Sequence, residues 1–186
     1  MKKIIGILLF SLSVSHAQAK GILDDVVLGV SLIRQDVNLT ISASGSSIDR
    51  SESATGFGVY IDKYYKRKLR FNSTLSYVAY DIFDLTALTV SADYLVPLNQ
   101  KVSFFAGLTG GPGLQKYSDT GISDASLGLV YGAEIGGIAY VSSNLMIESG
   151  YRRKLSNMKT EVTSISGMNS ALDEVNEFYF SFLLMF

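Results

Sequence analysis

The sequence predicts an all-β protein that folds as one eight-stranded antiparallel up-and-down barrel. Beyond residue 20, apolar residues recur at every second position, which is the period of a β-strand. The 11 Tyr and 10 Phe favour strands, and glycines inside the patterned segments argue against long helices. Turn-like clusters recur at the spacing of a meander, and a length of 186 residues suits a single domain.

Residues 1–19 are predicted to be a secretory signal peptide. Lys2 and Lys3 supply the positive start, residues 4–12 form a short apolar run, and residues 17–19 (Ala-Gln-Ala) form a small-x-small cleavage site. The alternative is a transmembrane anchor, but serines interrupt the run before about 20 apolar residues accumulate. Residues 20–186 would then form the barrel domain, and the only histidine, His16, would be removed.

Taken in order, the eight segments each place apolar residues on one face, and the other face is mostly small or polar. In the second segment Phe57 and Val59 flank Gly58, and in the last segment four phenylalanines share one face. Such a face must be buried in protein or in lipid. The predicted strands cover residues 25–41, 54–64, 68–80, 83–96, 101–111, 126–140, 144–154 and 174–186. The predicted lipid-facing residues are Leu28, Val30, Phe57, Val59, Ile61, Phe71, Leu75, Tyr77, Val90, Tyr94, Phe104, Leu108, Leu127, Leu129, Ile135, Leu145, Ile147, Phe180, Phe182 and Leu184.

The lengths of the connections favour a membrane barrel, because alternation alone also fits a soluble barrel. Links on one side are short and three links on the other side are long and polar, as expected when both termini lie at the periplasmic end. The short links are 65–67, 97–100 and 141–143, and the long ones are 42–53, 112–125 and 155–173. The long links are predicted to be extracellular loops.

The signal peptide, the eight alternating strands and the aromatic last strand together resemble the small outer-membrane barrels of Gram-negative bacteria. This group includes the OmpA transmembrane domain, the OmpX/Ail proteins and the opacity proteins. The resemblance implies an integral outer-membrane protein, exported through its signal peptide and surrounded by outer-membrane lipid. It also implies that the barrel assembly machinery reads the terminal strand through Tyr179, Phe180, Phe182, Leu184 and Phe186.

No catalytic residues, metal ligands or cofactor are predicted. The enzymes considered first for such a barrel are lipid A deacylases, palmitoyltransferases and outer-membrane proteases. They need a histidine, and the mature chain would have none. The absence of cysteine removes thiolate chemistry, and a net charge of −1 removes the electrostatic basis for binding nucleic acid. Residues 110–113 (Gly-Gly-Pro-Gly) are interpreted as a turn, because no Lys-Ser/Thr follows them. Asp119 and Asp124 do not fit the spacing of a calcium-binding loop.

Charged residues with inward parity predict ion pairs inside the barrel. A turn centred on Lys66 would place Asp62 opposite Arg70, and the short link at 81–82 would place Arg70 opposite Asp93. A turn centred on Ser143 would place Glu134 opposite Arg152. The predicted network comprises Asp62, Arg70, Asp93, Glu134, Glu148, Arg152 and Glu177. The alternative is that these charges line a water-filled lumen.

Three functions follow from these observations. The first is a non-enzymatic outer-membrane barrel that serves adhesion, another surface interaction or envelope structure, with host or envelope molecules contacting its loops. The second is a small porin-like channel, which inward Tyr60, Tyr80 and Phe105 would block. The third is a soluble periplasmic barrel that binds a ligand.

Overall fold

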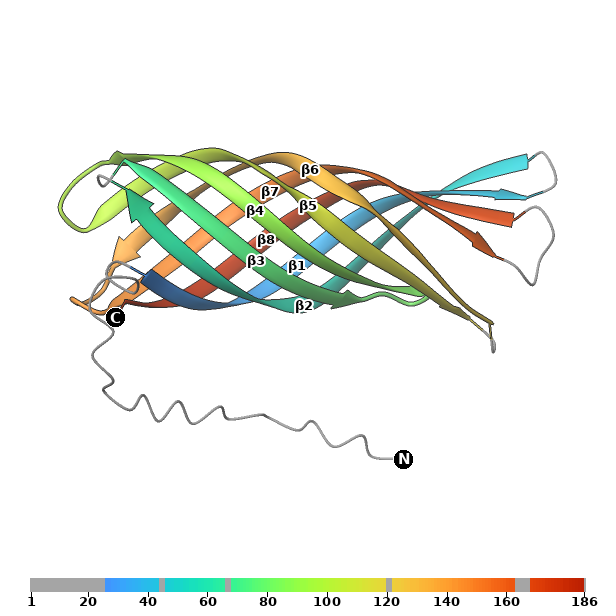
Figure 1. The fold of residues 1–186 in the computed structure, drawn as a ribbon, viewed down its shortest axis with the longest axis horizontal. Helices are drawn as coiled ribbons and strands as arrows, with labels where there is room; N and C mark the ends of the chain where they lie inside the picture. The colour runs from blue at the N-terminus through green and yellow to red at the C-terminus, as the bar shows by residue number, and fades with distance from the viewer. Residues whose placement is uncertain (1–25, 44–45, 66–67, 120–121, 163–167, 186) are drawn as a thin grey trace, which may run out of the picture.

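The computed structural model describes residues 26–43, 46–65, 68–119, 122–162 and 168–185, which form a closed barrel (Figure 1). Every strand is antiparallel to the next, and β1 pairs with β8 to complete the barrel. The predicted all-β, eight-stranded antiparallel barrel is therefore confirmed. The strands are β1 (Val26–Ala43), β2 (Ser46–Tyr65), β3 (Leu69–Ala79), β4 (Phe83–Pro97), β5 (Val102–Asp119), β6 (Ile122–Tyr140), β7 (Leu145–Val162) and β8 (Met168–Met185).

The predicted signal peptide and Phe186 lie outside the described residues. Among the residues that are described, no helix has both the length and the apolar character needed to cross a membrane.

The outer surface of the barrel carries a continuous apolar belt. All the residues predicted to face lipid lie on it, with Leu28, Leu145 and Ile147 half-buried and the others exposed. Phe57, for example, is 59% exposed and Leu129 is 52% exposed. Soluble monomers rarely expose apolar patches of this extent, because apolar surface in water is costly.

The two ends of the barrel differ in the length of their connections. The first and last described residues lie at one end, on the left of Figure 1, where short links join β2 to β3, β4 to β5 and β6 to β7. At the opposite end, long hairpins project from the barrel. We refer to these as the terminal end and the hairpin end.

The predicted long loops are wrong in extent, because paired strands occupy most of them. β1 and β2 remain paired to Ala43 and Ser46, and β7 and β8 remain paired to Val162 and Met168. Continued pairing satisfies backbone hydrogen-bonding groups that a loop would leave to water. The segments expected to be polar loops are therefore mostly polar β-hairpins.

The predicted turn at residues 110–113 is also wrong, because these residues lie inside β5. Ala87 pairs with Gly113 and Val90 pairs with Gly110, so β4 runs alongside the whole stretch. A Cβ atom at Gly111 would lie 2.0 Å from the carbonyl oxygen of Leu88. Glycine at this position allows the backbones of β4 and β5 to approach closely. The glycines therefore mark a close contact between strands and not a turn.

Four strands continue beyond the barrel as a projecting sheet in the order β7-β8-β1-β2. The last pair between β2 and β3 at this end joins Gly56 and Val78, and the last pair between β6 and β7 joins Val130 and Ser156. By contrast, β1 stays paired with β8 as far as Ser42. Among the described residues, the β2 edge of this sheet is therefore open. The β7 edge is joined to β6 only through side chains, by the Ser126 and Thr160 hydroxyls and by Leu129 N–H, which donates to Asn157 Oδ1. The β5-β6 hairpin itself projects on the right-hand side of Figure 1.

Candidate functional site

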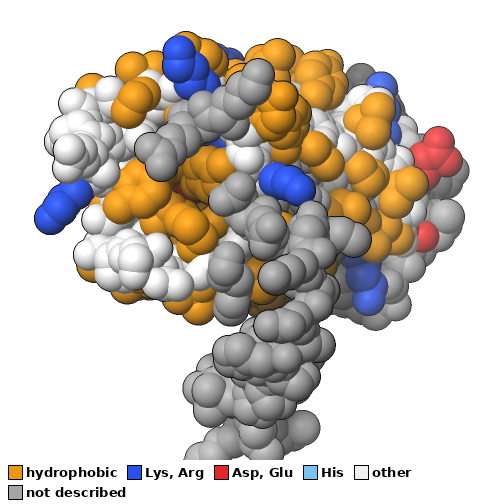
Figure 2. Space-filling view, turned by 60° about the vertical axis from the view of Figure 1, so that its left-hand side comes forward, with side chains coloured by type: hydrophobic (Ala, Val, Ile, Leu, Met, Phe, Trp, Pro, Cys, Tyr) orange, Lys and Arg blue, Asp and Glu red, His pale blue; other side chains and the backbone are white. Residues whose placement is uncertain are grey.

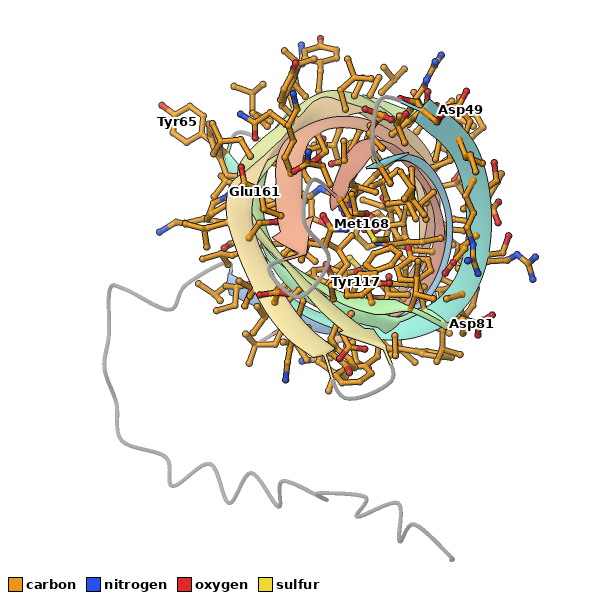
Figure 3. The ribbon with its side chains drawn as sticks, turned by 90° about the vertical axis from the view of Figure 1, so that its right-hand side faces the viewer. Asp49, Tyr65, Asp81, Tyr117, Glu161 and Met168 are labelled. Atoms are coloured by element: carbon orange, nitrogen blue, oxygen red, sulfur yellow. The ribbon has the colours of Figure 1, made fainter. Side chains whose placement is uncertain are left out.

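Side chains fill the interior of the barrel. Two clusters of buried apolar residues occupy it, one including Leu95 and Leu183 and the other including Phe83 and Met158. The view from the hairpin end in Figure 3 shows side chains packed throughout the lumen. Because an eight-stranded barrel is only wide enough to hold its own side chains, this packing leaves no wide water path.

The three aromatic residues predicted to block the lumen all lie inside it. Tyr60 and Phe105 are each 3% exposed. The ring of Tyr80 stacks on Phe83 with centroids 4.3 Å apart, and its hydroxyl donates to Gln35 Oε1 at 2.7 Å. These contacts disfavour an open pore.

Arg70 is the centre of the first of two buried ion clusters. Its Nε and Nη2 atoms both lie 2.8 Å from Asp93 Oδ2. Its Nη1 donates to Glu148 and lies 3.5 Å from Asp62 Oδ2. The guanidinium group lies 4.3 Å from the centroid of the Phe105 ring, a cation–π contact. All four charged side chains are fully buried.

Arg152 is the centre of the second cluster. Its Nε donates to Glu134, and its Nη1 donates to Glu177 Oε1 at 3.0 Å. The other oxygen of Glu177 accepts a hydrogen bond from Lys154 Nζ at 2.8 Å. The guanidinium group lies 4.1 Å from the centroid of the Tyr179 ring. The planar guanidinium group donates to two carboxylates while it stacks on the tyrosine ring, a combination that suits arginine better than lysine.

Two of the three predicted cross-strand pairings match the structure, and the third is wrong. Arg70 lies opposite Asp93, and Glu134 lies opposite Arg152. Asp62, however, lies opposite Asn72. The β2-β3 pairs are centred one residue later than expected, as in Tyr65 opposite Leu69, so the register is moved by two residues. Arg70 therefore reaches Asp62 along a diagonal, and Asn72 Nδ2 donates to Asp62 Oδ1 at 2.5 Å.

The sequence interpretation missed several members of the interior network, among them Lys154 and Gln35. Lys154 has the same parity as Arg152, two residues away, and that signal was available. Gln35 has inward parity on β1, and its Nε2 donates to Glu177 Oε2 at 2.5 Å. Its role depends on the register between β1 and β8, which the sequence pattern does not set because no turn joins these two strands.

The residues of the predicted assembly signal have different surroundings. Phe180, Phe182 and Leu184 lie on the outer belt. Tyr179 points inward, where its hydroxyl donates to Glu148 Oε1 at 3.0 Å. Tyr179 therefore belongs to the interior network, whatever it contributes during assembly.

A recess opens at the terminal end. It has a volume of about 500 Å³ and is lined in part by Tyr64, Tyr140 and Met185. Figure 2 shows apolar side chains around and within a hollow on this face. Among the described residues, no group of three or more His, Asp or Glu side chains could hold a metal ion.

A closed eight-stranded barrel with an apolar belt, a filled charged interior and polar hairpins at one end has the fold of the small outer-membrane barrels. Neisserial surface protein A is similar, with a TM-score of 0.58 and 16% identity, over 84% of this chain and 97% of that protein. OprG from Pseudomonas aeruginosa gives a TM-score of 0.51 and 13% identity, over 88% of this chain and 97% of that one. Ail from Yersinia pestis gives a TM-score of 0.44 and 14% identity, over 86% of this chain and 99% of that one.

No protein-family model matches this sequence, and no curated protein sequence does either. The likeness to solved structures therefore concerns the fold. At that level, the resemblance to small outer-membrane barrels predicted from the sequence is confirmed.

Proposed function

We propose that this chain is a non-enzymatic, integral outer-membrane barrel that acts through its hairpin end, as an adhesion or surface-interaction protein or as a structural component of the envelope. The observation that carries the proposal is the contrast between a filled interior and a large polar sheet that projects from one end. A filled interior leaves the outer surfaces as the parts available for contact.

The apolar belt supports the location in a membrane. Exposed residues such as Val59, Leu75 and Ile135 suit contact with lipid chains, and closure of the barrel leaves no unpaired strand edge within the belt. The belt disfavours the soluble periplasmic barrel. Carbonate extraction of membranes tests the location: the protein should stay in the membrane pellet, and release into the soluble fraction would contradict the proposal.

The projecting sheet supplies the proposed contact surface. Thr40 Oγ1 donates to Asp49 Oδ1 at 3.1 Å and to Asp173 Oδ2 at 2.7 Å, so polar side chains join β2, β1 and β8 on this sheet. Asp49 and Glu161 are labelled near its rim in Figure 3. Residues 46–55 of β2 have no β3 partner among the described residues, so this edge of the sheet offers backbone groups to an extended segment of a host or envelope protein.

Shortening one hairpin at a time tests the proposal. Cells displaying the full chain should adhere to epithelial monolayers or immobilised matrix, and a variant with residues 41–48 replaced by a two-residue turn should lose adhesion. A matched control replaces residues 116–125 in the β5-β6 hairpin and should keep most of it. Equal adhesion of all three, and of cells without the protein, would contradict the adhesion role.

The terminal strand supports a proposed contact with the barrel assembly machinery. Phe180, Phe182 and Leu184 are exposed on the outer face of β8, where another protein can reach them before lipid does.

A further inference from the structure

Two buried carboxyl groups of the interior network lie side by side. Asp93 on β4 is opposite Gly107 on β5, and Gly107 is opposite Glu134 on β6. The two acids therefore occupy one row, separated only by a residue without a side chain. A Cβ atom at Gly107 would lie 2.0 Å from Asp93 Oδ1, so this oxygen occupies the space over the glycine. Asp93 and Glu134 are therefore the side chains that flank Gly107 on either side in this row.

Each acid uses one oxygen for an arginine and has no donor for the other. Asp93 Oδ2 accepts from Arg70, and Glu134 Oε2 accepts from Arg152. Asp93 Oδ1 and Glu134 Oε1 are buried with no hydrogen-bond donor, and each residue is only 1% exposed. Two ionised carboxylates on either side of one glycine in a buried row repel each other, and buried acceptors without donors are costly. One proton removes both penalties.

We propose that Asp93 and Glu134 hold a single proton between them and form a proton-binding site inside the barrel. The protonated carboxyl group donates its O–H to the other carboxylate. Its hydrogen bond joins the two ion clusters into one chain, from Arg70 through Asp93 and Glu134 to Arg152. Among the described residues the interior holds five carboxylates and three cations, so a bound proton also reduces an excess of negative charge.

The other ionisable groups around the pair already have partners of opposite charge or are neutral tyrosines. Asp62 is the competing site for a proton, because its Oδ2 also has no hydrogen-bond donor. This oxygen lies 3.5 Å from Arg70 Nη1, however, and Asn72 donates to Oδ1, so a cation and an amide already compensate the carboxylate. The titratable groups that face the interior from the packed strands are Tyr60, Asp62 and Tyr64 of β2, Arg70 of β3, Tyr80 after β3, Tyr117 of β5, Tyr140 of β6, Glu148, Arg152 and Lys154 of β7, and Glu177 and Tyr179 of β8.

The site has a measurable consequence for stability. In the unfolded chain both acids are ionised above about pH 5, whereas the folded chain would keep one proton. The unfolded state then binds fewer protons than the folded state, so the stability of the barrel falls as pH rises. For one proton, the equilibrium constant for unfolding rises about tenfold per pH unit.

Urea unfolding in detergent micelles at a series of pH values tests the proposal. The wild-type protein should show the tenfold rise per pH unit around neutrality. In Asp93→Asn the amide donates to Glu134 in place of the proton, so this variant should show no such dependence. Asp62→Asn is the matched control and should keep it. No dependence in the wild type, dependence that survives in Asp93→Asn, or dependence lost in Asp62→Asn would overturn the assignment.

A second measurement needs no substitution. The infrared spectrum of the folded wild-type protein at neutral pH should contain the carbonyl band of a protonated carboxylic acid. Carbon-13 labelling of aspartate and glutamate side chains, each in turn, should shift that band, because the two residues share the proton. Absence of the band from the folded protein at neutral pH would overturn the proposal even if Asp93→Asn fails to fold.

Discussion

Lys154 and Glu177 form an ion pair inside the barrel, with Lys154 Nζ and Glu177 Oε2 2.8 Å apart and both side chains almost fully buried. Arg152 donates to the other oxygen of Glu177, and Gln35 donates to the same oxygen as Lys154. Glu177 thus joins β1, β7 and β8 from within. Gln35 lies directly opposite Glu177 across the seam where the first and last strands close the barrel.

Replacing Lys154 with Met should destabilise the barrel strongly. The substitution removes a buried cation and leaves Glu177 with less compensation, and breaking a buried pair costs about 3 to 5 kcal/mol. Urea unfolding of refolded protein measures the change. Arg153→Met is the matched control, because Arg153 is exposed and binds Glu174 at the surface, so stability should hardly change. Equal effects of the two substitutions would mean that Lys154 is in contact with water.

A double-mutant cycle on Glu134 and Arg152 should reveal a strong coupling. The two residues lie directly opposite each other, and Arg152 Nε donates to the Glu134 carboxylate in a buried site. We expect Glu134→Gln and Arg152→Met to be far from additive when combined, with a coupling energy of at least about 1 kcal/mol. A coupling below about 0.5 kcal/mol would place this pair in water and favour a wet lumen.

Placing lysine at Ile135 should cost about 2 to 4 kcal/mol, because Ile135 lies in the middle of the apolar belt and a charge there would face lipid. Unfolding of protein refolded into lipid vesicles measures this cost. Ser51→Lys, on the exposed part of β2 beyond the barrel, is the control and should have little effect. An Ile135→Lys protein as stable as the wild type would contradict the proposed facing.

Gly111→Ala and Gly110→Ala should differ although the residues are adjacent. A methyl group at Gly111 would lie 2.0 Å from the Leu88 carbonyl oxygen, whereas at Gly110 its nearest neighbour would be 3.5 Å away. We therefore expect Gly111→Ala to lose about 1 to 3 kcal/mol and Gly110→Ala to keep its stability. Equal tolerance in thermal unfolding would contradict the close approach of β4 and β5.

Deleting Phe186 should reduce assembly in cells more than folding in vitro. The residue lies outside the described part of the chain, so its role rests on the resemblance of the last strand to outer-membrane assembly signals. The amount of protein inserted in cells should fall, whereas refolding into micelles should stay nearly intact. An equal loss in both assays would mean that the deletion acts through the stability of the barrel and not through recognition during assembly.

The sequence predicted the barrel well because the period of alternation is a local property of each strand. The same parity placed Glu134 opposite Arg152 and Arg70 opposite Asp93. The register of Asp62 was wrong because it depends on the turn, where a shift of the centre by one residue moves the pairing by two. The extent of the hairpins was missed because polar, Ser-rich strands have no apolar face to mark them.

Conductance of the refolded protein in a planar bilayer tests the sealed barrel most directly. The interior contains Phe105, Tyr60 and two ion clusters, all buried, so we predict no steady ohmic current above that of the bare bilayer. Gly150 marks one position where the Tyr179 ring leaves no room even for a methyl group. Reproducible, steady openings of the wild-type protein would contradict the sealed interior and restore the channel as the function.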